Sequence, residues 1–102
     1  TNAIVLPAVL KFNAPAIDDK LPAMCAALGL QRVDFESFYV AICQLLDRLS
    51  VPVTLAEIGV PAEAARALAE KAHQDAAAGT NPRPADAGAI ERLIVEAITV
   101  GR

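Results

Sequence analysis

The sequence predicts an all-α protein, a bundle of about five helices with one short helical turn. Apolar residues recur at intervals near 3.6 along most of the chain, and no stretch shows the sustained alternation typical of a strand. Prolines, glycines and residues that can cap a helix separate the periodic segments. With 102 residues the chain has room for one hydrophobic core, so residues 1–102 are expected to form one helical domain.

The first two helices are expected over residues 3–13 and 19–28. The first is apolar on nearly every side, which implies that other helices cover it all round. In the loop that follows, Asp18 or Asp19 can cap the second helix by accepting its free amide hydrogens. Gly29 is placed to end that helix in a left-handed turn.

Asp34 can cap a third and longer helix, which carries the strongest amphipathic signal in the chain. Its apolar positions follow a 3-4-3 spacing through Phe35, Phe38, Ile42, Leu45, Leu46 and Leu49. The sequence "TLAE", residues 54–57, then has the hydroxyl and carboxylate spacing of a capping box. It predicts a single helical turn that ends at Gly59.

Pro61 is expected to open the next helix, which extends to about Ala77 and carries Arg66 and Glu70 as an exposed i,i+4 pair. The residues expected to face inward are Ala64, Ala65, Leu68 and Ala72. Asp86 can cap the last helix. Its inward stripe is expected to comprise Ile90, Leu93, Ile94, Ala97 and Ile98.

Charge and hydropathy exclude several classes of function. The chain has 9 basic and 12 acidic residues, a net charge of −3 and no basic block, so nucleic acid is not an expected partner. The longest uncharged apolar run, residues 3–10, is far shorter than the roughly 20 residues that span a bilayer, so no membrane association is expected. We expect a cytoplasmic protein with free thiols, because no charged leader precedes this run and both cysteines lie in apolar helical patterns.

The chain offers no complete catalytic or metal-binding set. The one histidine, His73, stands two residues before Asp75, and two residues span about 200° around a helix, so their side chains cannot share a metal. Cys25 and Cys43 lie in no ligand spacing such as Cys-x-x-Cys, and the glycines form no phosphate-binding loop. We therefore expect no catalytic, cofactor-binding or metal-binding residue within these 102 positions.

The segment "TNPRP" places Arg83 between two prolines. Asn81 precedes a proline and is biased to extended geometry, and Pro82 and Pro84 fix their own φ angles. The segment is therefore expected to be a stiff corner between two helices. We expect Arg83 to anchor it by bonding either a carboxylate such as Asp75 or the carbonyls at a helix end.

Four stretches resemble, in order and spacing, the C-terminal helical domain of the iron-containing, or group III, alcohol dehydrogenases. They are "TNAIVLPAVLKFN", "KLPAMCAALGL", "VPVTLAEIGV" and "HQDAAAGTNPRPADAGAIERL", and they cover nearly the whole chain. The combination of "NAIVLP…FN" with "D…TNPRP" is specific, whereas one of these motifs alone is weak. The resemblance implies the C-terminal part of a dehydroquinate synthase-like helical fold.

The resemblance also implies a larger, two-domain enzyme that interconverts alcohols with aldehydes or ketones. Its N-terminal domain would bind NAD or NADP, and its helical domain would bind Fe²⁺ or Zn²⁺ through an aspartate and three histidines. The last of these histidines, in an "HG" pair, would lie three residues ahead of Thr1. The chain alone would then be inactive, and its partners would be the missing N-terminal domain and metal-domain helices; a homo-oligomer is compatible with this arrangement.

The family alignment implies one further position of interest and leaves two alternatives. Ala77 matches a position near the substrate pocket where some members carry cysteine, and helix packing is the competing role for it. The maleylacetate reductases share the fold and the "NPRP" turn, but they usually carry aromatic residues where this chain has "AAAGT", which favours alcohol dehydrogenase. The alternative from another class is a stand-alone helical module that binds a protein partner through its apolar first helix.

Overall fold

The computed structural model describes residues 2–102, and this part of the chain contains helices and no strand. The predicted all-α class is therefore confirmed. Short 3₁₀ turns join the α-helices. Among the described residues, none of the helices has the length and apolar character of a membrane-spanning segment. The α-helices are α1 (Asn2–Asn13), α2 (Leu21–Ala27), α3 (Phe35–Arg48), α4 (Ala65–Gln74) and α5 (Ala87–Thr99); the 3₁₀ turns are η1 (Ala14–Ala16), η2 (Asp18–Lys20), η3 (Leu55–Ile58), η4 (Ala62–Ala64) and η5 (Ala76–Thr80).

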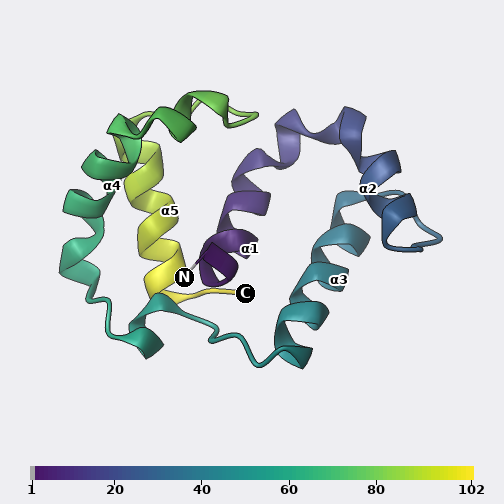
Figure 1. Cartoon of the computed structure of the whole chain (residues 1–102), viewed down its shortest axis with the longest axis horizontal. Helices are drawn as coiled ribbons and strands as arrows, with labels where there is room; N and C mark the ends of the chain where they lie inside the picture. The colour runs from purple at the N-terminus through teal and green to yellow at the C-terminus, as the bar shows by residue number, and fades with distance from the viewer. Residues whose placement is uncertain (1) are drawn as a thin grey trace.

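The helices form a single row with α1 near its centre (Figure 1). Helix α5 packs between α4 and α1, and α3 packs against α1 from the other side, with α2 beside α3. Two small cores result, because α1 separates the two groups of helices. The larger core contains Ile4, Ala8, Leu55, Ala65, Ala97 and Ile98, and the smaller one contains Leu21, Cys25 and Phe38.

Local hydrogen bonds explain where most helices begin and end. The Asp34 carboxylate accepts the Ser37 amide at 2.6 Å, and this bond holds the pKa of Asp34 below its usual value. The Asp86 carboxylate caps α5 by accepting the Ala89 amide at 2.7 Å. In η3, Glu57 accepts the backbone amide at the N-cap position at 2.8 Å, as expected of a capping box. These three predicted caps are confirmed.

The predicted cap of the second helix is wrong. Asp18 and Asp19 lie inside the 3₁₀ turn η2, which is closed by the Lys20 amide bonding to Ile17 at 2.9 Å. Their backbone therefore cannot take the extended geometry of an N-cap, and Lys20 takes that position without a side-chain bond. Helix α2 starts at residue 21 with a proline in its first turn, where the missing amide hydrogen has no helical partner in any case.

Helix α4 is shorter than predicted, and only part of its buried face was predicted correctly. It ends at Gln74, because Asp75 adopts extended backbone angles and its carboxylate accepts the Ala77 amide at 2.8 Å, which starts η5. Ala65 and Ala69 are the buried residues of α4, whereas Leu68 is 39% exposed. Ala65 is therefore buried as predicted, whereas Ala69 takes the inward place expected for Leu68. The other residues expected to face inward are only half-buried, as for Ala64, or exposed, as for Ala72.

Two further expectations concern exposure. The first helix is not covered all round by the described residues, since only Ile4, Pro7, Ala8 and Asn13 of α1 are buried. Arg66 and Glu70 do form the predicted pair, at 3.8 Å and well exposed on both sides. Such a pair contributes little to stability because solvent screens it.

Candidate functional site

The corner after η5 is tied to the end of α1 by a reciprocal pair of side-chain amides. Asn13 donates to the Asn81 oxygen at 3.0 Å, and Asn81 donates to the Asn13 oxygen at 2.8 Å, across 68 positions of sequence. The Asn81 amide also donates to the backbone oxygen of Arg83. Asn13 is only 7% exposed, so the pair satisfies a buried polar group. The corner is therefore held to α1 by specific polar contacts.

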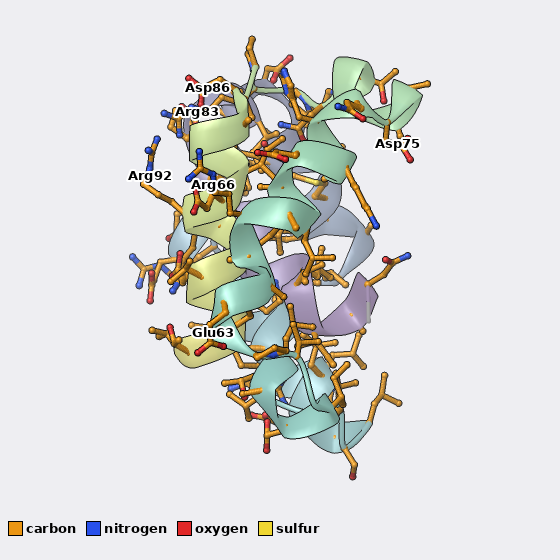
Figure 2. The ribbon with its side chains drawn as sticks, turned by 90° about the vertical axis from the view of Figure 1, so that its left-hand side faces the viewer. Glu63, Arg66, Asp75, Arg83, Asp86 and Arg92 are labelled. Atoms are coloured by element: carbon orange, nitrogen blue, oxygen red, sulfur yellow. The ribbon has the colours of Figure 1, made fainter. Side chains whose placement is uncertain are left out.

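Arg83 completes this attachment. Its Nη1 donates to the backbone oxygen of Phe12 at 2.9 Å, and its guanidinium carbon lies 4.2 Å from the centre of the Phe12 ring. Of the two partners expected for Arg83, it takes the helix-end carbonyl. Asp75 points away on the other side of the molecule (Figure 2), where it begins η5.

A pocket of about 480 Å³ opens between α1, α5 and the end of α4. Its polar side chains are Asn2, Asp75 and Asn81, and Ala77 forms part of its wall. The remaining lining is alkyl or aromatic and comprises Val9, Phe12, Ala72, Ala78, Ala85, Ile90 and Leu93. The structure thus brings together Asp75, Ala77 and Asn81 of the sequence candidates.

The polar groups at this pocket are largely committed to the protein itself. The Asp75 carboxylate accepts the Ala77 amide, and the Asn81 amide bonds Asn13 and Arg83. No lysine, arginine or histidine is among the described residues that line the pocket. An apolar wall with one carboxylate and no cation suits the hydrocarbon part of an uncharged ligand.

A second, more polar pocket of about 370 Å³ lies on the opposite side of Phe12 and Leu93, which line both. Arg83 and Arg92 line this outer pocket with Lys11, whose ammonium is 3.5 Å from the Glu96 carboxylate. The two prolines of the corner, Pro82 and Pro84, line neither of these pockets. Pro84 lines a shallow recess beside the exposed His73, and Pro82 is exposed to solvent.

Lys11 also contacts Tyr39 on the facing helix α3, a pair that the sequence analysis did not identify. Its ammonium lies 5.1 Å from the centre of the tyrosine ring, and this neighbour raises the pKa of Lys11. Burial raises the pKa of the Tyr39 phenol. Within residues 2–102 the buried phenol oxygen has no hydrogen-bond partner.

The side chains that usually bind metal ions lie apart from one another among the described residues. Among residues 2–102, no three histidine, cysteine, aspartate or glutamate side chains lie close enough to hold a metal ion. Cys25 and Cys43 are free, and Cys25 is buried in the smaller core. The remaining candidate site within residues 2–102 is the apolar pocket beside the corner.

Three of the pocket residues were not predicted from the sequence, namely Phe12, Ile90 and Leu93. The aromatic residue in "KFN" at the end of α1 was one available signal, because it immediately precedes the asparagine that pairs with the corner. Ile90 and Leu93 were assigned only to the inward stripe of the last helix. Both are half-buried, and their exposed parts face the pocket.

An all-helical domain with an apolar pocket beside a proline-rich corner is the class of protein that these observations define. Residues 1–98 match the C-terminal region of the Fe-containing alcohol dehydrogenase family, and the chain belongs to this family. The chain is 30% identical over 84 residues to a protein of Salmonella typhimurium described as "Probable alcohol dehydrogenase EutG". That match covers 82% of this chain and 21% of the relative, so the chain spans about a fifth of the relative's length.

Proposed function

We propose that this chain is the C-terminal helical region of a metal-dependent and nicotinamide-dependent alcohol dehydrogenase. In this proposal the apolar pocket beside Ala77 receives the hydrocarbon part of an uncharged alcohol, aldehyde or ketone. Family membership supports the class of reaction. The observation that carries the assignment of the pocket is its lining, which is mainly alkyl and aromatic and contains no cation among the described residues.

The charge at the pocket favours a neutral substrate over the dicarboxylate that a maleylacetate reductase-type enzyme would take. Asp75 already contributes a carboxylate to the lining. Further carboxylates placed beside it would be repelled by its charge, and no lysine or arginine among the described lining residues would pair with them. Alcohol dehydrogenase is therefore the better supported of the two related activities.

The parent enzyme would take Fe²⁺ or Zn²⁺ and NAD or NADP through residues outside this sequence, and this chain alone would be inactive. Its partners would be the N-terminal domain and the other metal-domain helices of the same protein. Apolar side chains left uncovered on the described residues support such partners, since Val40 and Leu45 on α3 and Leu49 just after it are 41%, 39% and 65% exposed. The two free cysteines support a cytoplasmic location for the enzyme.

The test begins with the gene upstream of Thr1. We expect codons for an "HG" pair three residues ahead, and further upstream a D-x-x-x-H pair and a Gly-Gly-Gly-Ser phosphate loop. The longer protein should oxidise 1-butanol and 1-hexanol with NAD or NADP, measured by the absorbance of the reduced cofactor. A chelator should abolish this turnover, and added Fe²⁺ or Zn²⁺ should restore it.

Three results would contradict the proposal. The first is a start codon immediately before Thr1, and the second is alcohol oxidation by the purified 102-residue chain. The third is a longer protein that reduces maleylacetate but oxidises no alcohol. The matched control for the second result is the same chain preparation with each cofactor and no alcohol.

A further inference from the structure

Phe12 and Leu93 form a partition between two pockets that differ in character. On one side is the apolar pocket of about 480 Å³, and on the other is the charged outer pocket of about 370 Å³. Phe12 is half-buried, so its ring is not fixed by complete enclosure in the core. A contact from the outer side can therefore influence its position.

Arg83 is the residue that makes this contact. It reaches Phe12 through two different groups, the backbone oxygen at 2.9 Å and the ring at 4.2 Å. Together the two contacts restrict the movement of the end of α1 and the rotation of the ring, because moving the ring away would lose the cation–π attraction. Arg83 itself lies outside the apolar pocket.

The position of Arg83 is itself fixed from behind. Its backbone oxygen accepts a hydrogen bond from Asn81, whose side chain also bonds the buried Asn13. The prolines on either side of Arg83 restrict its backbone further. A side chain on such a preorganised corner loses less conformational entropy when it holds a neighbour in place.

We propose that Arg83 is a positioning residue that holds the Phe12 ring as a wall of the apolar pocket, and so sets how tightly this pocket binds an uncharged alkyl chain. This inference deepens the proposed function, because it concerns the same pocket and the class of ligand assigned to it. Arg83 does not contact the ligand. Its effect is transmitted through Phe12 alone.

The test measures binding and needs no catalysis. The 102-residue chain with ¹³C-labelled phenylalanine is titrated with 1-hexanol and, separately, with hexanoate, and the aromatic resonances are followed by NMR. Phe12 should shift with hexanol, with affinity in the millimolar range expected for a ligand of this size, whereas hexanoate should bind at least threefold more weakly. Phe38 belongs to the smaller core and Phe35 packs against it, so their resonances serve as internal references.

Variants then separate positioning from general stability. Arg83→Met should weaken hexanol binding at least threefold, and Arg83→Lys should recover part of the loss by restoring a cation above the ring. Arg92→Met is the matched control, because Arg92 lines the same outer pocket but, among residues 2–102, makes no hydrogen bond or cation–π contact with Phe12. In a Phe12→Leu background, Arg83→Met should have no further effect on binding.

Each outcome bears on the inference. It is overturned if hexanol shifts no Phe12 resonance, if Arg83→Met binds hexanol as the unmodified chain does, or if Arg92→Met weakens binding equally. It is also overturned if Arg83→Met remains harmful in the Phe12→Leu background. If Arg83→Met does not fold, the hexanol affinities of Arg83→Lys and Phe12→Leu are compared with that of the unmodified chain instead, and unchanged affinities overturn the inference. If the variants change hexanol binding as expected but the longer protein oxidises no alcohol, the proposed function is refuted and the positioning role of Arg83 still holds.

Discussion

Replacing Arg102 should destabilise the protein, because its nearly buried side chain bonds the region that follows α3. The Arg102 guanidinium donates to the backbone oxygens of Val51 at 2.7 Å and Pro52 at 3.2 Å, and its Nε donates to the Asp47 carboxylate at 2.8 Å. Its side chain is only 6% exposed. These bonds join the segment after α5 to the end of α3 and the loop that follows α3.

The expected cost can be worked from these contacts. A hydrogen bond to a charged group contributes about 1.5–3 kcal/mol, and Arg102→Met leaves two backbone oxygens without their donor. The longer bond to Pro52 counts for less, and the Asp47 carboxylate is 65% exposed, so solvent screens that ion pair. We expect the free energy of unfolding to fall by about 3 kcal/mol. For a domain of this size that corresponds to a decrease of roughly 10–20 °C in Tm.

Urea and thermal unfolding followed by circular dichroism measure this change directly. Asp47→Asn should cost less than about 1 kcal/mol, because it removes only the exposed ion pair and leaves both backbone bonds. Arg48→Met, at the exposed end of α3, is the matched control and should be nearly neutral. A loss below about 1 kcal/mol for Arg102→Met would refute the reasoning, as would equal losses for Arg102→Met and Asp47→Asn.

Two further predictions concern backbone geometry and pH. Gly101→Ala should destabilise the protein by at least about 2 kcal/mol, because Gly101 has a φ of +70° and an added Cβ would lie 2.0 Å from a backbone oxygen. The control in the same urea assay is Gly79→Ala, since nothing lies within 4 Å of a Cβ added at Gly79. Tyr39 and Lys11 both have a raised pKa in the folded protein, so the stability that they contribute is present below about pH 10 and lost as the pH rises further. The urea midpoint should therefore fall more steeply above pH 10 in the unmodified chain than in Tyr39→Phe, and identical profiles would contradict this assignment.

The parts of the fold that the sequence predicted correctly depend on contacts three or four residues apart. Asp34 and Asp86 each bond an amide three positions ahead, so the capping pattern is visible in the sequence itself. Asp18 and Asp19 carry the same local signal, but the turn closed on Ile17 competes with the cap and determines their geometry. Local patterns alone do not reveal which of the two arrangements has the lower free energy.

The pocket depends on contacts that no local pattern encodes. Arg83 meets Phe12 across 71 positions of sequence, and the proline-flanked corner predicted only that Arg83 would find some anchor. Ala77 was placed near the substrate pocket by family resemblance, whereas Phe12 and Leu93 become its neighbours only when α1 and α5 pack together. The sequence therefore indicated the corner but not the wall that it supports.

The reciprocal amide pair between Asn13 and Asn81 makes two distant positions change as one. Replacing either residue by alanine would leave the other without the side-chain partner that its amide bonds, and Asn13 is buried. A substitution at one position is therefore tolerated best when the other changes with it, and the combined cost should be smaller than the sum of the two separate costs. The end of the first helix and the corner 68 residues later are therefore expected to change together during evolution, although they are far apart in the sequence.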